Sequence, residues 1–260
     1  MQVTFLGTAD GHTSPLGRSH SGILIQASDF SLLLDCGANV AQYLSMHKID
    51  PNVPEAIWLS HAHSDHIGQF PMLIQSLWLR TRRAPLHIYA PDAIVPVLQD
   101  YLVKCILFPE LIGFPIVWHP LTPTAKATKH GGFTLKGFAT AHLDNLASFF
   151  QKKYPQTCFD CYGLVLDTPK GRYVYSADIA LPEELRPALK KPVKALFCEL
   201  THFPEAALFE ELAGKSVETL CVTHYPDHFV KAEAALRKLA KKSGYKGKVE
   251  VMTERQTCEL

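Results

Sequence analysis

The feature that most constrains this 260-residue sequence is the run Leu-Ser-His-Ala-His-Ser-Asp-His-Ile-Gly at residues 59–68. It follows an apolar, β-rich segment and precedes an amphipathic segment of helical period, so it occupies a strand-to-helix turn. Residues two apart in an extended segment project to the same side, so His61 and His63 can present ring nitrogens to one metal ion. Asp65 and His66 follow the turn and can face a second ion. Imidazole and carboxylate are ligands that zinc accepts, so the run predicts a metal site at a strand end.

Strand-like and helical segments alternate along the whole sequence, without a linker, a low-complexity tract or an internal repeat. We expect strands at residues 3–6, 23–27, 31–34, 56–59, 86–89, 133–140, 162–166, 173–176, 195–198, 219–222 and 248–252. Helical periodicity is clearest at residues 67–78, 93–103, 204–213 and 228–241. Residues 168–171, Thr-Pro-Lys-Gly, indicate a hairpin turn. The pattern predicts an α/β fold in a single domain over residues 1–260, with two mixed sheets packed face to face and helices outside.

Charge and composition exclude several classes of protein. The 26 Lys and Arg residues nearly balance the 25 Asp and Glu residues, so the net charge of +1 predicts no general attraction to nucleic acid or membranes. The most apolar long stretch, residues 105–118, is interrupted by Pro109, Glu110 and Pro115, so we expect no transmembrane helix. The first residues lack the basic start and apolar run of a signal peptide. Seven cysteines, an odd number, favour reduced thiols, and we expect a cytoplasmic protein.

The histidine run resembles the His-x-His-x-Asp-His signature of the metallo-β-lactamase-fold superfamily, and the likeness continues along almost the full chain. The matching segments are Leu33-Leu34-Asp35-Cys36-Gly37, Thr140-Ala141-His142, Tyr175-Ser176-Ala177-Asp178 and Val222-Thr223-His224-Tyr225. The resemblance implies the αβ/βα sandwich of that superfamily with two zinc ions in it; manganese or iron is the alternative metal. It implies that one zinc is held by His61, His63 and His142, the other by Asp65, His66 and His224, and that Asp178 bridges them.

The resemblance also assigns Asp35 the role of an acid that orients a ligand histidine. On their residue types alone, His142 and His224 are also compatible with core histidines, and Asp178 and Asp35 are equally compatible with strand-end caps.

Within the superfamily the sequence is most similar to the ribonuclease Z-like phosphodiesterase branch. The similar segments are residues 5–11, 21–25 and 198–203. The sequence departs from the ribonuclease at its last ligand, because Tyr225, Pro226, Asp227 and His228 follow His224 where that enzyme has a His-x-Ser-x-Arg-Tyr segment. No long Gly/Pro-rich insertion of the kind that grips transfer RNA is found. The resemblance therefore implies phosphodiester chemistry more directly than activity on transfer RNA.

These features predict a hydrolase in which two metal ions share a hydroxide that attacks a phosphorus or carbonyl centre. Asp65 is expected to orient the hydroxide or take its proton. Glu199 and His202, three residues apart, are candidates for a proton relay to the leaving group, or simply a strand-end carboxylate and a helix-entry histidine. We expect the substrate to be a small or cyclic phosphodiester or an RNA end. The alternatives are a tRNA 3′-processing endonuclease, a lactone or ester hydrolase, and a metal-binding protein without catalysis.

Three weaker features leave alternatives open. Cys158 and Cys161 form one Cys-x-x-Cys pair, which lacks the further ligands of a structural zinc site. Basic residues cluster at 80–83, 152–153 and 237–242, as solvated helix faces or as contacts to a polyanion. Residues 142–161 carry several aromatic side chains and are interpreted as a lid over the site or as an interface. A homodimer is compatible with the sequence, whereas a membrane partner is not expected.

Overall fold

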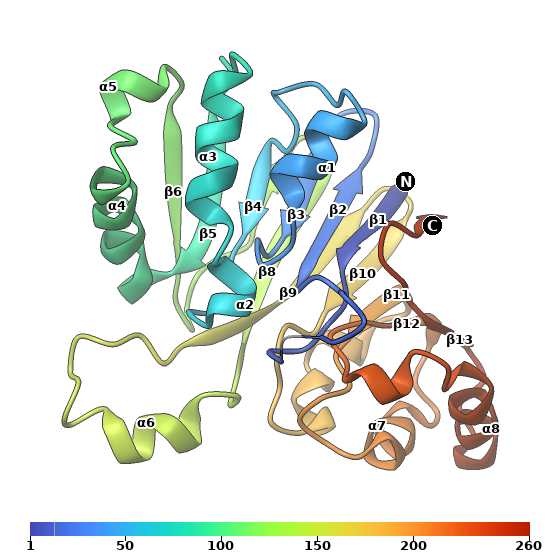
Figure 1. Cartoon of the computed structure of the whole chain (residues 1–260). Coiled ribbons are helices and arrows are strands. Elements are labelled where there is room, and N and C mark those ends of the chain that lie inside the picture. Colours follow the sequence, from blue (N-terminus) through green and yellow to red (C-terminus); the bar gives the residue numbers. More distant parts are fainter. Residues whose placement is uncertain (13) are drawn as a thin grey trace.

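Two β-sheets face each other in the computed structural model, which describes residues 1–12 and 14–260 and assigns seven strands to each sheet within them (Figure 1). In spatial order the first sheet contains β14 (Thr257–Glu259), β1 (Gln2–Gly7), β2 (Gly22–Gln26), β3 (Ser31–Leu34), β4 (Ala56–Trp58), β5 (Leu86–Pro91) and β6 (Ile116–Leu121). The second contains β13 (Lys248–Val251), β12 (Val217–Val222), β11 (Val193–Cys198), β10 (Gly171–Tyr175), β9 (Cys161–Thr168), β8 (Phe133–Thr140) and β7 (Thr128–His130). Both sheets are mixed, because β3–β6 and β10–β13 run parallel while the other pairs are antiparallel.

The strands are apolar on both faces because both faces are covered. In β4, Ala56 and Trp58 point between the two sheets, whereas Ile57 packs under the helices of the first sheet. In β11, Phe197 lies between the sheets and Leu196 packs under the helices of the second sheet. This explains why the central strands read as near-continuous apolar runs instead of a strict apolar–polar alternation.

Helices cover the outer face of each sheet (Figure 1). The first sheet carries α1 (Val40–Met46), α2 (Ser64–Ile67), α3 (Phe70–Leu79), α4 (Val95–Lys104) and α5 (Pro109–Ile112), and the second carries α7 (Glu205–Leu212) and α8 (Glu233–Ser243). Short 3₁₀ turns occur at Asp92–Ile94, Pro182–Leu185, Ala188–Lys190 and Asp227–Phe229. The remaining helix, α6 (Asp144–Phe150), projects from the body on a long segment. None of the helices in the described part of the chain has the length and apolarity to cross a membrane.

The predicted fold class is confirmed, since two mixed sheets pack face to face with helices outside. Each predicted strand overlaps an observed one, and the hairpin turn at 168–171 joins β9 to β10 with Thr168 opposite Gly171. The sequence analysis missed β6, β7 and β14, and each of them is the last strand of a sheet. Pro120 in β6 has no N–H to donate, which an edge strand tolerates and which hid the strand in the sequence.

Two predicted helices were wrong in extent. The helix expected at 67–78 begins only at Phe70, because the Gln69 N–H donates to the Cys36 carbonyl oxygen and Pro71 has no N–H with which to extend the helix toward Ile67. The helix expected from residue 228 begins only at Glu233, since Asp227–Phe229 forms a separate 3₁₀ turn. Helices α1, α2, α5 and α6 were not predicted, and all four are seven residues or shorter.

Candidate metal centre

The predicted site residues all follow strands, and the two sheets bring these strand ends together. Sheet one supplies Asp35 after β3 and the His61–His66 segment after β4. Sheet two supplies the others after β8, β10, β11 and β12, namely His142, Asp178, Glu199, His202 and His224. The sandwich thus joins candidate metal ligands that are up to 163 residues apart in sequence, from His61 to His224. A ligand set of this kind depends on both sheets.

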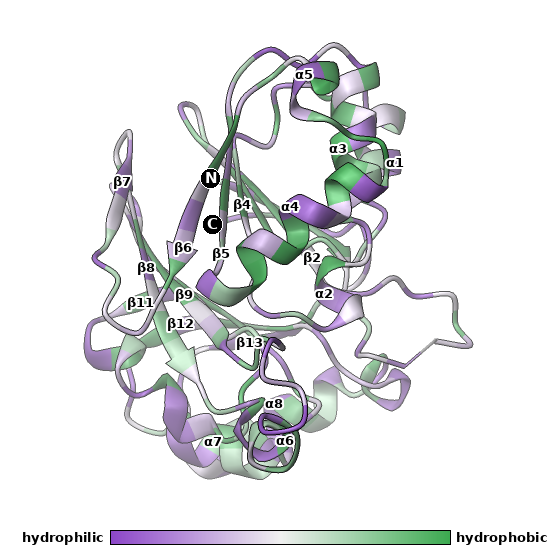
Figure 2. Cartoon of the chain, turned by 90° about the vertical axis from the view of Figure 1, so that its left-hand side faces the viewer, coloured by the Kyte–Doolittle hydropathy of each residue, from purple (hydrophilic) through white to green (hydrophobic). Residues whose placement is uncertain are grey.

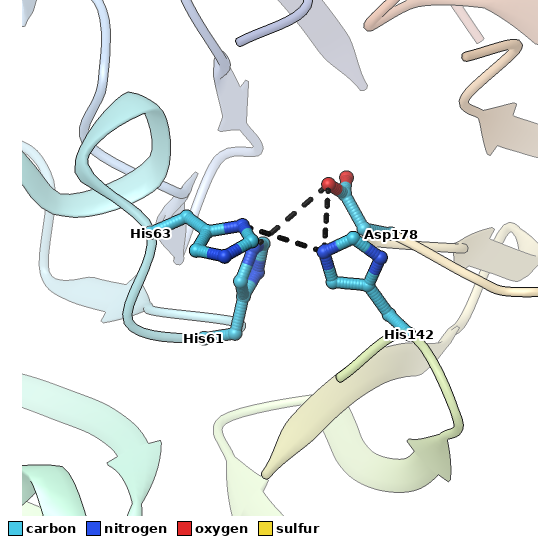
Figure 3. A group of neighbouring side chains, drawn as sticks. All are labelled: His61, His63, His142 and Asp178. Atoms are coloured by element: carbon cyan, nitrogen blue, oxygen red, sulfur yellow. Dashed lines mark hydrogen bonds and ion pairs between the residues drawn. The ribbon is translucent and has the colours of Figure 1, made fainter. Parts of the chain in front are cut away.

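The first group of side chains contains His61, His63, His142 and Asp178, whose ligand atoms lie within 4.8 Å of one another (Figure 3). His61 Nε2 is 3.8 Å and His142 Nε2 is 3.6 Å from Asp178 Oδ2. His142 Nε2 is also 3.4 Å from His63 Nδ1. Three imidazoles and a carboxylate converging on one point form a donor set that suits a divalent transition metal.

The second group contains Asp65, His66 and His224, again with ligand atoms within 4.8 Å. His66 Nε2 and His224 Nε2 lie 3.4 and 3.9 Å from Asp65 Oδ2. Asp178 connects the two groups, because His66 Nε2 is 3.4 Å from its Oδ1 and His224 Nε2 is 3.4 Å from its Oδ2. The geometry therefore has two adjoining ligand sets with one shared carboxylate.

Several polar atoms at the centre of this cluster have no hydrogen-bond partner, which indicates whether metal ions would fit there. Among the residues that the structure describes, His61 Nε2, His66 Nε2 and Asp178 Oδ1 are buried without a hydrogen-bond partner. A buried polar atom without a partner is costly, and a bound metal would satisfy all three. The donor set and its unpaired atoms fit divalent metal ions.

A hydrogen-bond network behind the cluster fixes the orientation of its rings. Asp35 Oδ2 lies 2.7 Å from His66 Nδ1 and accepts hydrogen bonds from Ser60 Oγ (2.8 Å) and Tyr175 Oη (2.6 Å). Ser21 Oγ lies 2.9 Å from His224 Nδ1. Partners of this kind set the tautomer of a ligand histidine and leave its other nitrogen for a metal. Asp35 lies where the resemblance implied, whereas the contacts of Ser21, Ser60 and Tyr175 were not anticipated.

The backbone at the strand ends is strained where it presents these groups. Asp35, Ala177 and His224 have positive φ angles of 56°, 51° and 45°. Such angles are unusual for residues with a side chain and are concentrated at functional sites. Nearby, a Cβ atom on Gly37 would lie 1.6 Å from the Asp65 carbonyl oxygen, so only glycine allows this close approach.

Glu199 and His202 form a hydrogen-bonded pair at the rim of the cluster. His202 Nδ1 lies 2.7 Å from Glu199 Oε2, and the buried carboxylate also accepts from the Ile179, Thr201 and His202 backbone N–H groups. The His202 ring is 4.5 Å from that of His142 and 31% of its side chain is exposed. Burial alone would lower the His202 pKa, but the hydrogen bond and charge of Glu199 outweigh it and raise this pKa. His202 is thus a partly exposed ring that lies beside the candidate ligand His142.

The pKa values of the ligands follow from burial and from the shared acid. Burial lowers the pKa of His142 to about 4, despite the opposing charge of Asp178. Burial and the neighbouring His66 likewise hold the pKa of His61 well below its ordinary value. For Asp178, burial is outweighed by the charges of His224 and His66, and its pKa is lowered. The charge of Asp178 in turn outweighs burial and raises the pKa values of His66 and His224, so a metal ion at the second group would have to displace protons from these two rings.

The structure also describes the basic residues, the cysteines and the 142–161 segment, each of which had two interpretations in the sequence. Arg82 is fully buried and donates to the Pro54, Ala84 and Pro85 carbonyl oxygens, so it does not contact a polyanion. The cysteines are free thiols, and Cys161 Sγ lies 3.4 Å from the Asp178 carbonyl oxygen. Helix α6 buries none of its side chains, so a lid or an interface at residues 142–161 stays a prediction.

Comparisons with known proteins agree with the fold and the predicted superfamily. Ribonuclease Z from Methanothermobacter thermautotrophicus is 37% identical over 153 residues, which cover 59% of this chain and 48% of the relative. The match spans about a third to a half of the length of the first curated ribonuclease Z relatives. The metallo-β-lactamase fold protein YhfI from Bacillus subtilis superposes with a TM-score of 0.77 at 23% identity, covering 99% of this chain and 98% of that one.

The short form of human tRNase Z superposes with a TM-score of 0.66 at 18% identity, covering 100% of this chain and 99% of that one. These two superpositions concern the fold. The predicted likeness to the ribonuclease Z-like branch is confirmed by the sequence relatives. In addition, the sequence model of one family, anti-Pycsar protein Apyc1, matches residues 1–243.

Proposed function

This chain belongs to the anti-Pycsar protein Apyc1 family, and we propose that it is a metal-dependent hydrolase of small phosphodiesters, cyclic nucleotides among them. The observation that carries the proposal is one carboxylate, Asp178, lying between two ligand groups with a Glu199-supported histidine at their rim. Two adjacent divalent cations suit a reaction at a phosphorus centre, where both the attacking and the leaving oxygen carry negative charge.

The seven candidate ligands would hold two metal ions, and their imidazole and carboxylate donors suit zinc. His61, His63 and His142 would bind one, Asp65, His66 and His224 the other, and Asp178 both. When bound, the ions would lower the pKa of water and neutralise the charge that develops on the phosphoryl oxygens. The unpaired buried atoms of His61, His66 and Asp178 support this assignment.

We assign Asp65 the role of orienting the attacking water and accepting its proton. One of its oxygens, Oδ2, faces His66 and His224, which leaves the other free to accept a hydrogen bond from the attacking water. A carboxylate in this position orients the water and takes its proton as the bond to phosphorus forms. The charge of His66 outweighs burial and lowers the Asp65 pKa, so the carboxylate is ionised and ready to accept.

We assign His202 the role of donating a proton to the leaving group. The hydrogen bond and charge of Glu199 raise the His202 pKa against burial, which favours the protonated ring, and Glu199 fixes Nδ1 so that Nε2 is the nitrogen left to donate. A proton delivered to the departing oxygen removes the cost of expelling an alkoxide. Glu199 positions His202 and does not itself contact the substrate.

Several contacts support a small substrate over a long polyanion. Arg18, the basic residue beside the β12 strand end, donates to the carbonyl oxygens of Thr8 and Tyr225 and to Asp227 Oδ1. The charge of Arg18 is therefore already paired with Asp227. The buried Arg82 guanidinium donates to a backbone carbonyl oxygen instead. Few cations are left at these positions for phosphates distant from the reaction centre. The similarity to ribonuclease Z nevertheless supports processing of a tRNA 3′ end as the second candidate function.

A substrate panel tests the proposal. We expect purified protein with about two metal equivalents at this centre to hydrolyse bis(p-nitrophenyl) phosphate and 3′,5′-cyclic nucleotides. The same preparation is assayed on a precursor tRNA and on a lactone series, with Asp65→Asn as the matched control for contaminating activity. Cleavage of the tRNA alone at its 3′ end would replace the small-substrate proposal with the second candidate. Hydrolysis of lactones alone would refute phosphodiester chemistry.

A further inference from the structure

A second group of histidines lies on the strands, away from the strand ends that form the metal centre. His87 belongs to β5, His119 to β6 and His130 to β7. Their ring nitrogens lie within 4.8 Å of one another, and His87 Nδ1 is 2.9 Å from His119 Nε2. Three imidazoles on rigid strands therefore converge on one point outside the proposed active site.

The position of this group connects the two sheets. Strand β6 is the last strand of the first sheet and β7 is the last strand of the second. Both belong to the side of the molecule that faces the viewer in Figure 2. His87 and His119 come from the first sheet and His130 from the second, so any ion bound by all three would link the open edges of the sandwich.

We propose that His87, His119 and His130 bind one further divalent transition-metal ion, such as Zn²⁺, through three imidazole nitrogens. Imidazole is the ligand that Zn²⁺, Cu²⁺ and Ni²⁺ share, and three histidines with one open position are an established zinc geometry. Two nitrogens bound to one tetrahedral zinc are about 3.3 Å apart, a separation that the 2.9 Å contact between His87 and His119 reaches with a small adjustment. All three rings are partly exposed, so water has access to the fourth position.

The surroundings of the rings favour their neutral, metal-binding form. Burial, followed by nearby positive groups, lowers the pKa of each ring: Arg82 acts on His87, and His87 acts on His119 and His130. Tyr89 Oη hydrogen-bonds His130 Nε2 and its ring stacks on His119 at 4.4 Å, which fixes two of the three orientations. Contacts of this kind prepare a histidine for a metal before the metal arrives.

A simpler account is that the cluster only stacks and shares a hydrogen bond. The chain supplies a matched control for that account, because His47 stacks on Tyr43 at 4.3 Å just as His119 stacks on Tyr89. His47 lies at the end of α1, and the potential metal groups of the described residues do not include it. Replacing His47 removes a histidine–tyrosine stack without touching the proposed site.

The test counts metal in full-length protein after chelation and reloading with Zn²⁺. Wild type, His119→Gln, His130→Gln and His47→Gln are desalted and analysed by elemental mass spectrometry, with phosphodiesterase activity measured in parallel. We expect each of His119→Gln and His130→Gln to bind about one equivalent less than wild type, and His47→Gln to match wild type. The measured difference does not depend on how many ions the active site holds or on what it hydrolyses.

Thermal unfolding gives a second readout that detects a merely misfolded variant. Zn²⁺ at a large excess should raise the wild-type Tm by roughly 5–10 °C more than that of His119→Gln, because the ion links the two sheets only in the wild type. Equal metal content and equal Zn²⁺-induced Tm shifts in wild type and His119→Gln would overturn the proposal. A metal loss of the same size in His47→Gln would overturn it as well, since it would show that the effect is unspecific.

Discussion

The two histidine clusters of this protein are built in different ways from the same side chain. In the metal centre the rings follow strand ends, are mostly buried, and share space with Asp65 and Asp178. In the edge cluster of His87, His119 and His130 the rings lie on the strands, are partly exposed and have no carboxylate among the ligand atoms. The carboxylates of the first cluster would balance the charge of the two cations proposed there, whereas the second cluster offers only imidazoles. The comparison suggests that catalysis needs the acids, while one structural ion needs only the imidazoles.

The rings are also held by different contacts. Asp35 and Ser21 hydrogen-bond the outer nitrogens of His66 and His224 in the metal centre. In the edge cluster, stacking on Tyr89 takes much of that role. A hydrogen bond specifies which nitrogen faces the metal, but stacking specifies only the plane of the ring. We therefore expect the edge cluster to bind metal more weakly and to lose it first when a chelator is added.

The largest effect that separates the clusters should come from Asp65. Asp65→Asn is expected to lower kcat on bis(p-nitrophenyl) phosphate by a factor on the order of 10²–10⁴, because the group that accepts the proton of the nucleophile is lost. His119→Gln should leave kcat within about two-fold in the same assay. Steady-state kinetics with metal content measured on the same samples checks both. Near-native turnover of a metal-replete Asp65→Asn protein would mean that another group accepts the proton.

His202 should show a smaller effect that depends on the substrate. His202→Gln is expected to lower kcat by about 10²-fold for a phosphodiester with an alkoxide leaving group, since such a group needs a proton. For p-nitrophenolate, which leaves without protonation, the loss should be only a few-fold. The measurement is kcat against leaving-group pKa for wild type and variant. Parallel lines would show that His202 contributes to structure or binding and not to departure.

Replacing Asp35 should separate the two clusters by their metal affinity and not by the turnover number. Asp35→Asn should weaken metal binding at the centre by about 10–100-fold, because His66 loses the acceptor that fixes its tautomer. Competition with a chromophoric chelator measures the constant, and Ser31→Ala, at the other end of β3, is the control. We expect metal affinity to fall at the metal centre and to stay unchanged at the edge cluster. If both clusters weaken together, the substitution has disturbed the fold.

The smallest expected effect is that of salt. Activity on a small phosphodiester should change only a few-fold between about 50 and 200 mM salt, against the roughly 10³–10⁵ loss typical of six to ten phosphate contacts. The paired state of Arg18 and the burial of Arg82 are the structural reasons. The kcat/KM values for bis(p-nitrophenyl) phosphate and for a precursor tRNA across this range provide the check. Specific tRNA cleavage with a steep salt dependence would favour the RNA-processing candidate.

The grouping of the candidate ligands could be predicted from the sequence only where the information was local. His61, His63, Asp65 and His66 lie within six residues, so their spacing alone predicted a shared site. His142 and His224 needed the family resemblance, because nothing in their neighbourhoods indicates which strand ends meet. Three of the four edge strands, β6, β7 and β14, escaped prediction because Pro120 interrupts the pattern of β6 and because β7 and β14 are only three residues long.

The edge cluster shows the limit of such reasoning most clearly. His87, His119 and His130 are separated by 32 and 11 residues, and they meet only because β5 pairs with β6 and the two sheets face each other. The contacts of Ser21 and Tyr175 depend on the same packing. These contacts are properties of the sheet arrangement and could not be read from any one segment.

The division of the metal ligands between the two sheets has a consequence for how the protein is made. Up to His66 the growing chain carries four of the seven proposed ligands, but Asp178 and His224 follow only 112 and 158 residues later. A nascent chain therefore lacks the shared carboxylate until most of both sheets exists. Because unfolded histidines bind whichever divalent ion competes best, with copper ahead of zinc, late completion ties metal choice to the folded geometry. The complete ligand set therefore exists only in the folded sandwich, in which the strands of both sheets are present.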